Sequence, residues 1–178
     1  MDIKPKDPLL GAVRLLIVLI QLLAIFAMVM IGIGIGAMLS VQSTEIAAKI
    51  AEAGAPASGF WLLIGAMALI IVLLSLAFRF FKELSGIVNS VREGDPFQVQ
   101  NADRLTRMGW ISIGAHGLAI VLAALSAWFA PYLEKAGHDA EFGFDVEITG
   151  LLLTLILFVL ARVFRHGAAM REELEGTV

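Results

Sequence analysis

The stretch LLIVLIQLLAIFAMVMIGIGIGAML, residues 15–39, decides the fold class. Its 25 residues contain Gln21 as the only polar side chain. A helix needs about 20 predominantly apolar residues to cross the roughly 30 Å hydrocarbon layer of a bilayer. The stretch therefore predicts a membrane-spanning helix. Because the apolar core of a signal peptide is only about 7 to 15 residues long, we expect this helix to be retained in the mature protein.

The composition of the whole chain agrees with a membrane location. Of 178 residues, 59% are hydrophobic and 16% charged, and the mean hydropathy is +0.88. A soluble domain carries about 25% charged residues. The absence of cysteine excludes disulfides and thiolate metal sites. The net charge of −3 argues against direct nucleic-acid binding, which needs a concentrated basic surface.

Three further apolar stretches predict three more spans. We therefore expect an all-α integral membrane protein, a four-transmembrane-helix bundle that forms a single domain over residues 1–178. The last stretch is the shortest, but its helix can continue through Arg162 and Arg165, because arginine side chains reach back to the membrane surface. The four predicted spans are residues 15–39, 60–81, 108–129 and 148–165.

The distribution of lysine and arginine predicts the orientation in the membrane. Of the 13 lysine and arginine residues, 11 lie in segments that fall on one side of the predicted spans. Only Lys49 and Lys135 lie on the other side. Cytoplasmic loops carry the excess of these residues. We therefore expect a bacterial inner-membrane protein with both termini in the cytoplasm.

Beyond the second span the helix is predicted to continue into the cytoplasm. Phe81, Leu84, Val88 and Val91 recur every three or four residues among charged side chains, as in an amphipathic helix. Gly94 can end this helix in a left-handed cap, and Asn101 is predicted as the N-cap of the third helix. The segment therefore predicts a cytoplasmic helical hairpin, and the residues after Arg165 predict a cytoplasmic extension of the fourth helix.

Polar side chains within the spans indicate which helix faces are buried, because they are costly in lipid without partners. At about 1.5 Å per residue, Gln21, His116 and Thr154 lie at similar depths, and we expect them to form an intramembrane polar cluster. The His116 imidazole can be a hydrogen-bonded structural group, a proton-sensing or ligand-binding group, or a ligand of a cofactor. The first interpretation is favoured, and no cofactor is predicted.

Gly32 and Gly36 form a GxxxG spacing near the end of the first span. Such a pair allows another helix to approach closely, either within the chain or in a homo-oligomer. A different pattern, one histidine with scattered carboxylates, lies between the third and fourth spans. It predicts a solvated acidic loop and no metal site. The residues of this loop are His138, Asp139, Glu141, Asp145 and Glu147.

Two motifs resemble a known family. The first is REGDPF at residues 92–97 followed by NADRL at 101–105 and Met108-Gly109, and the second is LARVFRHG at 160–167 followed by REELEGTV at 171–178. Together they resemble the bacterial membrane family named domain of unknown function 2975. The resemblance implies four spans and no assigned chemistry. It also implies a possible partner, because members are often encoded beside a small helix-turn-helix regulator.

These motifs place the predicted partner surface on the cytoplasmic side. Its residues are Phe97, Asn101, Arg104, Arg107, Arg171, Glu172 and Glu173. Phe97 either packs on the base of the bundle or offers an anchor to a partner. Arg104 and Arg107 can pair with Glu172 or Glu173, or with lipid phosphate.

The leading functional hypothesis is a non-enzymatic interaction or regulatory protein of the inner membrane, which binds a cytoplasmic or membrane protein partner through the hairpin and tail. A structural accessory subunit of a larger membrane complex is the alternative. A small-solute or ion transporter is disfavoured, because the spans carry no acidic residue and no broken-helix pair. No convergent set of acid, base, nucleophile or metal ligands predicts an enzyme.

Overall fold

In the computed structural model, every long secondary-structure element is an α-helix. It describes residues 8–40, 48, 50–52, 54–56, 58–135 and 148–175. The four long helices are α1 (Pro8–Ser40), α3 (Ser58–Glu93), α4 (Val99–Lys135) and α5 (Ile148–Glu175). Each helix is long and apolar enough to cross a membrane. The prediction of an all-α protein with four such helices is confirmed.

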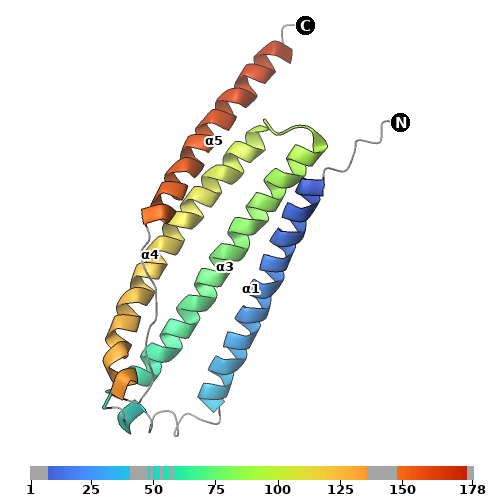
Figure 1. Ribbon diagram of the computed structural model, residues 1–178. Coiled ribbons are helices and arrows are strands. Elements are labelled where there is room, and N and C mark those ends of the chain that lie inside the picture. The colour runs from blue at the N-terminus through green and yellow to red at the C-terminus, as the bar shows by residue number, and fades with distance from the viewer. Residues whose placement is uncertain are drawn as a thin grey trace.

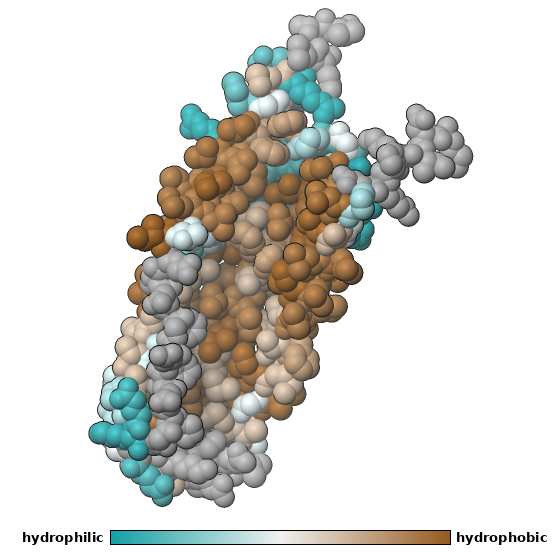
Figure 2. All heavy atoms as spheres, in the orientation of Figure 1, coloured by the Kyte–Doolittle hydropathy of each residue, from teal (hydrophilic) through white to brown (hydrophobic). Residues whose placement is uncertain are grey.

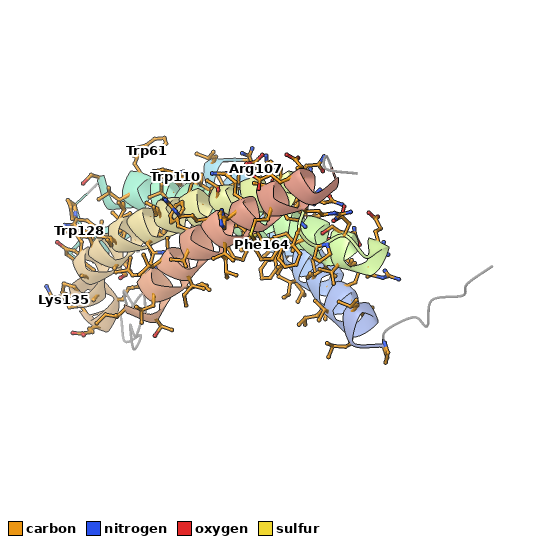
Figure 3. All side chains as sticks on the ribbon, turned by 90° about the horizontal axis from the view of Figure 1, so that it is seen from above. Trp61, Arg107, Trp110, Trp128, Lys135 and Phe164 are labelled. Carbon is orange, nitrogen blue, oxygen red and sulfur yellow. The ribbon has the colours of Figure 1, made fainter. Side chains whose placement is uncertain are left out.

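The helices form a curved row and not a closed bundle. Extensive contacts join α1 to α3, α3 to α4 and α4 to α5, so each helix packs mainly on its neighbours along the chain. Viewed from above, the row is open, with α1 and α5 at its two edges (Figures 1 and 3). The predicted bundle was wrong in this respect. Lipid tails are as apolar as leucine, so no hydrophobic force requires the row to close.

A hydrophobic core cluster joins α4 to α5. The buried residues of α5 recur at spacings of three, four and seven, which places them on one stripe facing α4. Leu157 and Ala161 of this stripe form a core cluster with Leu105 and Met108 of α4. Phe80, Leu84, Ile87 and Phe164 pack against this cluster. The core therefore lies toward the ends of the helices that carry the hairpin.

The length of α4 matches the thickness of a bilayer. Arg107 and Lys135 are separated by 28 residues, or about 42 Å of helix, close to the 40–45 Å of a bilayer with its headgroups. Between them Trp110 and Tyr132 are about 33 Å apart, as expected for aromatic residues at the two membrane surfaces. Apolar side chains cover the middle of the molecule, and hydrophilic ones gather at its ends (Figure 2).

We call residues 79–107 and 162–175 the hairpin end. From Arg79 to Glu93, α3 continues for 14 residues, or about 21 Å, beyond the first basic residue that follows its apolar stretch. The chain turns after Glu93 and returns as α4 from Val99 (Figure 1). The predicted helical hairpin is therefore present as a structural element, and the last turns of α5 pack beside it.

Relative to α4, α5 is displaced toward the hairpin end. Gly150 lies beside His116, and Thr154 lies beside Ser112, so α5 begins next to the middle of α4. Figure 1 shows the same displacement. His116 is nine residues, or about 13 Å, from Arg107 along α4. The first turn of α5 is therefore at membrane depth, and residues 136–147, which precede it, lie outside the described residues.

Candidate interaction site at the hairpin end

The turn of the hairpin is closed by backbone hydrogen bonds around Gly94. The amide of Gly94 donates to the carbonyl of Val91 at 3.1 Å, and the amide of Asp95 donates to that of Ser90 at 3.1 Å. Gly94 has a φ of 85°, in the left-handed region that glycine adopts without strain. This pair of bonds is a Schellman cap. The predicted end of the helix at Gly94 is confirmed.

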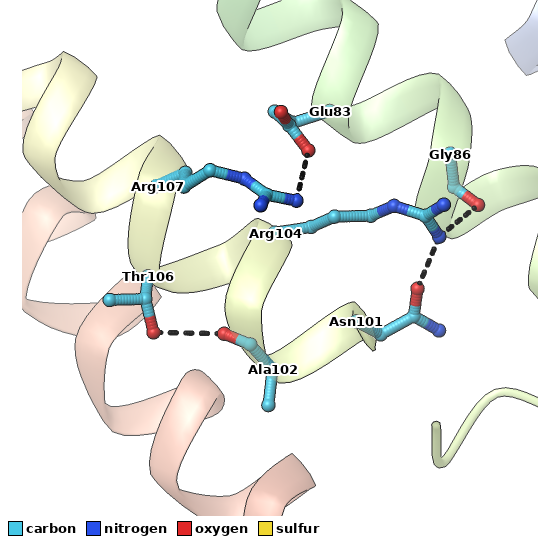
Figure 4. A network of polar contacts seen from close by, with 7 residues as sticks. All are labelled: Glu83, Gly86, Asn101, Ala102, Arg104, Thr106 and Arg107. Atoms are coloured by element: carbon cyan, nitrogen blue, oxygen red, sulfur yellow. Dashed lines mark hydrogen bonds and ion pairs between the residues drawn. The ribbon is translucent and has the colours of Figure 1, made fainter. Parts of the chain in front are cut away.

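The buried side chain of Asn101 stabilises the turn through hydrogen bonds. It has no exposed surface, and its amide nitrogen donates to Ser90 Oγ at 2.6 Å and to the Pro96 carbonyl at 2.8 Å. Its side-chain oxygen accepts a hydrogen bond from Arg104 Nη1 at 2.8 Å (Figure 4). The N-cap prediction was wrong, because α4 already begins at Val99. The assignment of Asn101 to a partner surface was also wrong, since the residue is buried.

Arg104 joins the two arms of the hairpin. Its Nη1 also donates to the Gly86 carbonyl at 3.0 Å (Figure 4). A Cβ on Gly86 would lie 2.7 Å from Arg104 Nε, so the guanidinium packs closely on the backbone of α3. The predicted pairing with Glu172 or Glu173 was wrong for Arg104, because the folded hairpin supplies nearer acceptors. Its role here is structural.

Arg107, one turn further along α4, pairs with α3 at the surface. Its Nη2 lies 3.1 Å from Glu83 Oε2 (Figure 4). The Arg107 side chain is 57% exposed. The predicted pairing of Arg107 with Glu172 or Glu173 was therefore also wrong. A surface ion pair contributes only about 0–1 kcal/mol. Arg107 remains accessible to lipid phosphate or to a partner.

Three contacts fasten the end of α5 to the hairpin. Arg165 Nη2 lies 3.0 Å from Asp103 Oδ1, and Arg171 forms an ion pair with Asp95. The third contact is aromatic: the rings of Phe97 and Phe164 are 5.3 Å apart. Asp95 was not among the predicted site residues. Its partner lies 76 residues away, and only the antiparallel packing of α5 on the hairpin brings the two together.

Phe97, in the turn between α3 and α4, packs against α5 but remains 47% exposed. A Cβ on Gly167 would lie 3.1 Å from Phe97 Cδ1, so the ring occupies the space that this glycine leaves open. Its docking onto the base of the helices, one of the two expected roles, is confirmed. The exposed half of the ring leaves the second role open. Near the end of α5, Glu172 and Glu173 are also exposed.

Within the spans, polar side chains join α4 to α5, and Ser75 Oγ of α3 donates to Met28 Sδ of α1 at 3.4 Å. Ser112 Oγ and Thr154 Oγ1 are 2.6 Å apart, and Thr154 Oγ1 donates to the Gly150 carbonyl at 2.9 Å. Since the threonine hydroxyl proton is used there, the Ser112 hydroxyl donates to Thr154. His116 Nδ1 lies 2.7 Å from the Ser112 carbonyl, which can only accept, so Nδ1 carries the proton. This arrangement matches the structural interpretation of His116.

Gln21 does not join this polar group. It lies on α1, which packs mainly on α3 and is two positions away from α4 and three away from α5 in the row (Figure 3). The predicted cluster of Gln21, His116 and Thr154 was therefore wrong in its first member. Similar depth in the membrane places residues at the same level, but only the order of the helices decides which of them meet.

The Gly32 and Gly36 pair faces away from the rest of the chain. A Cβ at either position would meet no atom within 4 Å, whereas a Cβ on Gly34 would lie 3.3 Å from Met67 Cε. Packing of the GxxxG pair within the chain is therefore excluded for the described residues. The homo-oligomer alternative remains a prediction. The predicted acidic loop, residues 138–147, lies outside the described residues.

Three members of these contacts were not predicted from the sequence: Ser90, Phe164 and Gly150. The signal for Phe164 was present, because Leu157, Phe164 and Arg171 recur every seven residues and so share one stripe of a helix. Ser90 and Gly150 carry no such signal. Each is defined by a partner on another helix.

Comparison with protein families supports the family that the two motifs resemble. No curated protein and no solved structure matches the chain. A family model described as "Protein of unknown function (DUF2975)" matches residues 39–178, from the end of α1 through the hairpin, α4 and α5. Because the match covers most of the chain and includes both motifs, the chain belongs to the DUF2975 family of proteins of unknown function.

Proposed function

We propose that the chain is a non-enzymatic inner-membrane protein whose hairpin end docks a cytoplasmic protein partner. The observation that carries the proposal is the fastening of α5 to the hairpin by the Asp95–Arg171 and Asp103–Arg165 ion pairs and the Phe97–Phe164 contact. These contacts lie at the charged end of the fourth span and just beyond it, past the uncharged stretch of residues 148–161.

A surface whose helices are held together by such contacts favours binding, because it loses less conformational entropy when a partner docks. The exposed residues beside these contacts are chemically mixed. Met170 is 49% exposed and Phe97 is 47% exposed, and the carboxylate of Glu172 lies close by in the chain. Exposed apolar anchors with a polar rim are typical of protein interfaces.

The side of the membrane follows from the basic residues. The hairpin end holds Arg79, Lys82, Arg92, Arg104 and Arg107, together with the three arginines of α5, and such a concentration favours the cytoplasm. A helix-turn-helix regulator is our proposed class of partner. The proposal for this class rests on the family resemblance, and the docking surface rests on the contacts described above.

A matched pair of charge reversals tests the proposal. The tagged full-length chain is co-expressed with a small helix-turn-helix regulator of the kind that members of the family are often encoded beside, and the amount of regulator that co-purifies is measured. Glu172→Arg reverses an exposed charge at the hairpin end, and Glu52→Arg reverses an exposed charge at the opposite end. We expect Glu172→Arg to reduce co-purification at least several-fold and Glu52→Arg to leave it unchanged. Equal co-purification of both variants would contradict docking at the hairpin end.

A second candidate is an accessory subunit that binds another membrane protein through α1. The observation that favours it is the open face of α1, where a Cβ on Gly32 or Gly36 would meet no atom of the described residues within 4 Å. Native mass measurement after mild detergent extraction tests this candidate. A larger complex that dissociates in the Gly32→Leu and Gly36→Leu variant would favour it over the regulator.

A further inference from the structure

An apolar groove runs along the outer face of α5 at the hairpin end. Its volume is about 600 Å³, within the range of small-molecule sites. Val159, Val163 and Met170 line it from α5, and the exposed half of Phe97 forms a further part of the wall. These residues lie outside the stripe that packs on α4. The groove therefore belongs to a face of α5 that the described part of the chain leaves open.

Two basic side chains, Arg162 and His166, also line this groove, and no acidic side chain lines it among the described residues. They lie one helical turn apart. A second, smaller hollow beside the groove shares these two residues and adds Arg165. The groove thus combines an apolar floor with basic groups on one side.

Arg162 differs from the other two arginines of α5. Arg165 is neutralised by Asp103 and Arg171 by Asp95. Among the described residues Arg162 has no carboxylate within ion-pairing distance. Its charge is therefore available to an anionic group from outside the chain.

The depth of the groove matches the boundary of the hydrocarbon layer. Residues 148–161 carry no charge, so Arg162 is the first charged residue of α5. Val159 lies about 4 Å deeper along the helix, and Met170 about 12 Å further out. One end of the groove is therefore continuous with the lipid-facing surface, and the basic residues lie at the level of lipid headgroups.

We propose that this groove binds an anionic phospholipid, with the phosphate at Arg162 and His166 and an acyl chain along Val159 and Val163. Three observations support this occupant: the charge complementarity, the apolar floor and the open continuity with the bilayer. Basic pockets beside transmembrane helices at this level are suited to anionic headgroups. The proposal is independent of which protein docks at the hairpin end.

The experiment measures local lipid preference in vesicles. Because the chain has no cysteine, Ile156→Cys supplies a single labelling site, 52% exposed and one turn deeper than Val159. A bimane label there is quenched by brominated acyl chains. The labelled full-length chain is placed in phosphatidylcholine vesicles containing either brominated phosphatidylglycerol or brominated phosphatidylcholine. The ratio of the two quenching efficiencies gives the relative affinity at this site.

We expect brominated phosphatidylglycerol to be preferred about fivefold, which corresponds to about 1 kcal/mol for one arginine near the surface. Arg162→Gln should remove most of this preference, and Arg162→Lys should retain most of it. Arg14→Gln is the matched control, because Arg14 is an exposed basic residue on α1, at the other edge of the row. It should leave the preference at residue 156 unchanged.

Three results would overturn the proposal. Equal quenching by both lipids in the parent chain would mean that the groove does not select charge. An equal loss of preference in Arg14→Gln and Arg162→Gln would assign the preference to general surface charge. Absence of quenching by either lipid would mean that a protein, such as a second copy of the chain, covers this face.

Discussion

The imidazole of His116 lies directly over Gly150. A Cβ added to Gly150 would overlap the ring at Nε2, so α4 and α5 approach each other here only because residue 150 has no side chain. The contact is at membrane depth, near the first turn of α5. It sets the register of the two helices together with the Ser112–Thr154 hydrogen bond.

Gly150→Ala is expected to destabilise the protein. The added methyl group displaces the His116 ring, and overpacking of this kind costs about 1–3 kcal/mol, more than the about 0.5–1 kcal/mol that alanine gains in a helix. Thermal unfolding in detergent should show a lower midpoint. The double variant His116→Ala with Gly150→Ala should recover part of the loss. Gly117→Ala is the control, because its added methyl group would meet no atom of the described residues within 4 Å. A lower midpoint in Gly117→Ala equal to that of Gly150→Ala would argue against the contact.

Asn101→Ala is expected to be more destabilising than a surface change in the same turn. Asn101 is fully buried, and its loss removes the hydrogen bond to the Pro96 carbonyl and one acceptor of Arg104. A buried polar group left without a partner costs about 1–3 kcal/mol. Gln98→Ala, which removes one bond to Asp95, should cost less than about 1 kcal/mol. The thermal unfolding midpoints of the two variants are compared with that of the parent chain. A larger decrease of the midpoint in Gln98→Ala than in Asn101→Ala would contradict the role of Asn101.

Phe97→Ala should release the end of α5 more than the loss of an ion pair does. The half-buried ring contributes about 1–2 kcal/mol through burial and its contact with Phe164, whereas an exposed ion pair contributes about 0.2–1 kcal/mol. Limited proteolysis of the last two turns of α5 should therefore accelerate more in Phe97→Ala than in Arg171→Ala. Phe97→Leu, which keeps much of the apolar volume, should lie between the parent and Phe97→Ala. Faster cleavage of Arg171→Ala than of Phe97→Ala would show that the charges dominate.

Labelling of single cysteines should place the hairpin end in the cytoplasm. Glu93→Cys and Glu52→Cys are exposed positions at opposite ends of the molecule. In intact spheroplasts a membrane-impermeant maleimide should modify Glu52→Cys and leave Glu93→Cys unmodified until the membrane is broken. The reverse pattern would place the hairpin end outside, and a cytoplasmic partner could then not reach it.

The sequence by itself determined the features that depend on local patterns. The four apolar stretches predicted four helices, because helix formation satisfies backbone hydrogen bonds within each segment wherever water is absent. Gly94 predicted the end of α3, because an αL cap needs a residue without a side chain. The motif around the hairpin predicted the family, which the match to residues 39–178 confirmed.

Only the tertiary structure decided which residues meet. The order of the helices in an open row separated Gln21 from His116, and the displacement of α5 along α4 placed Arg171 beside Asp95. Side-chain periodicity shows which face of a helix is apolar, but in lipid that face has no hydrophobic reason to prefer one neighbour over another. The close approach at Gly150 and the hydrogen bond between α4 and α5 determine how these two helices pair. Both depend on pairs of residues far apart in the chain.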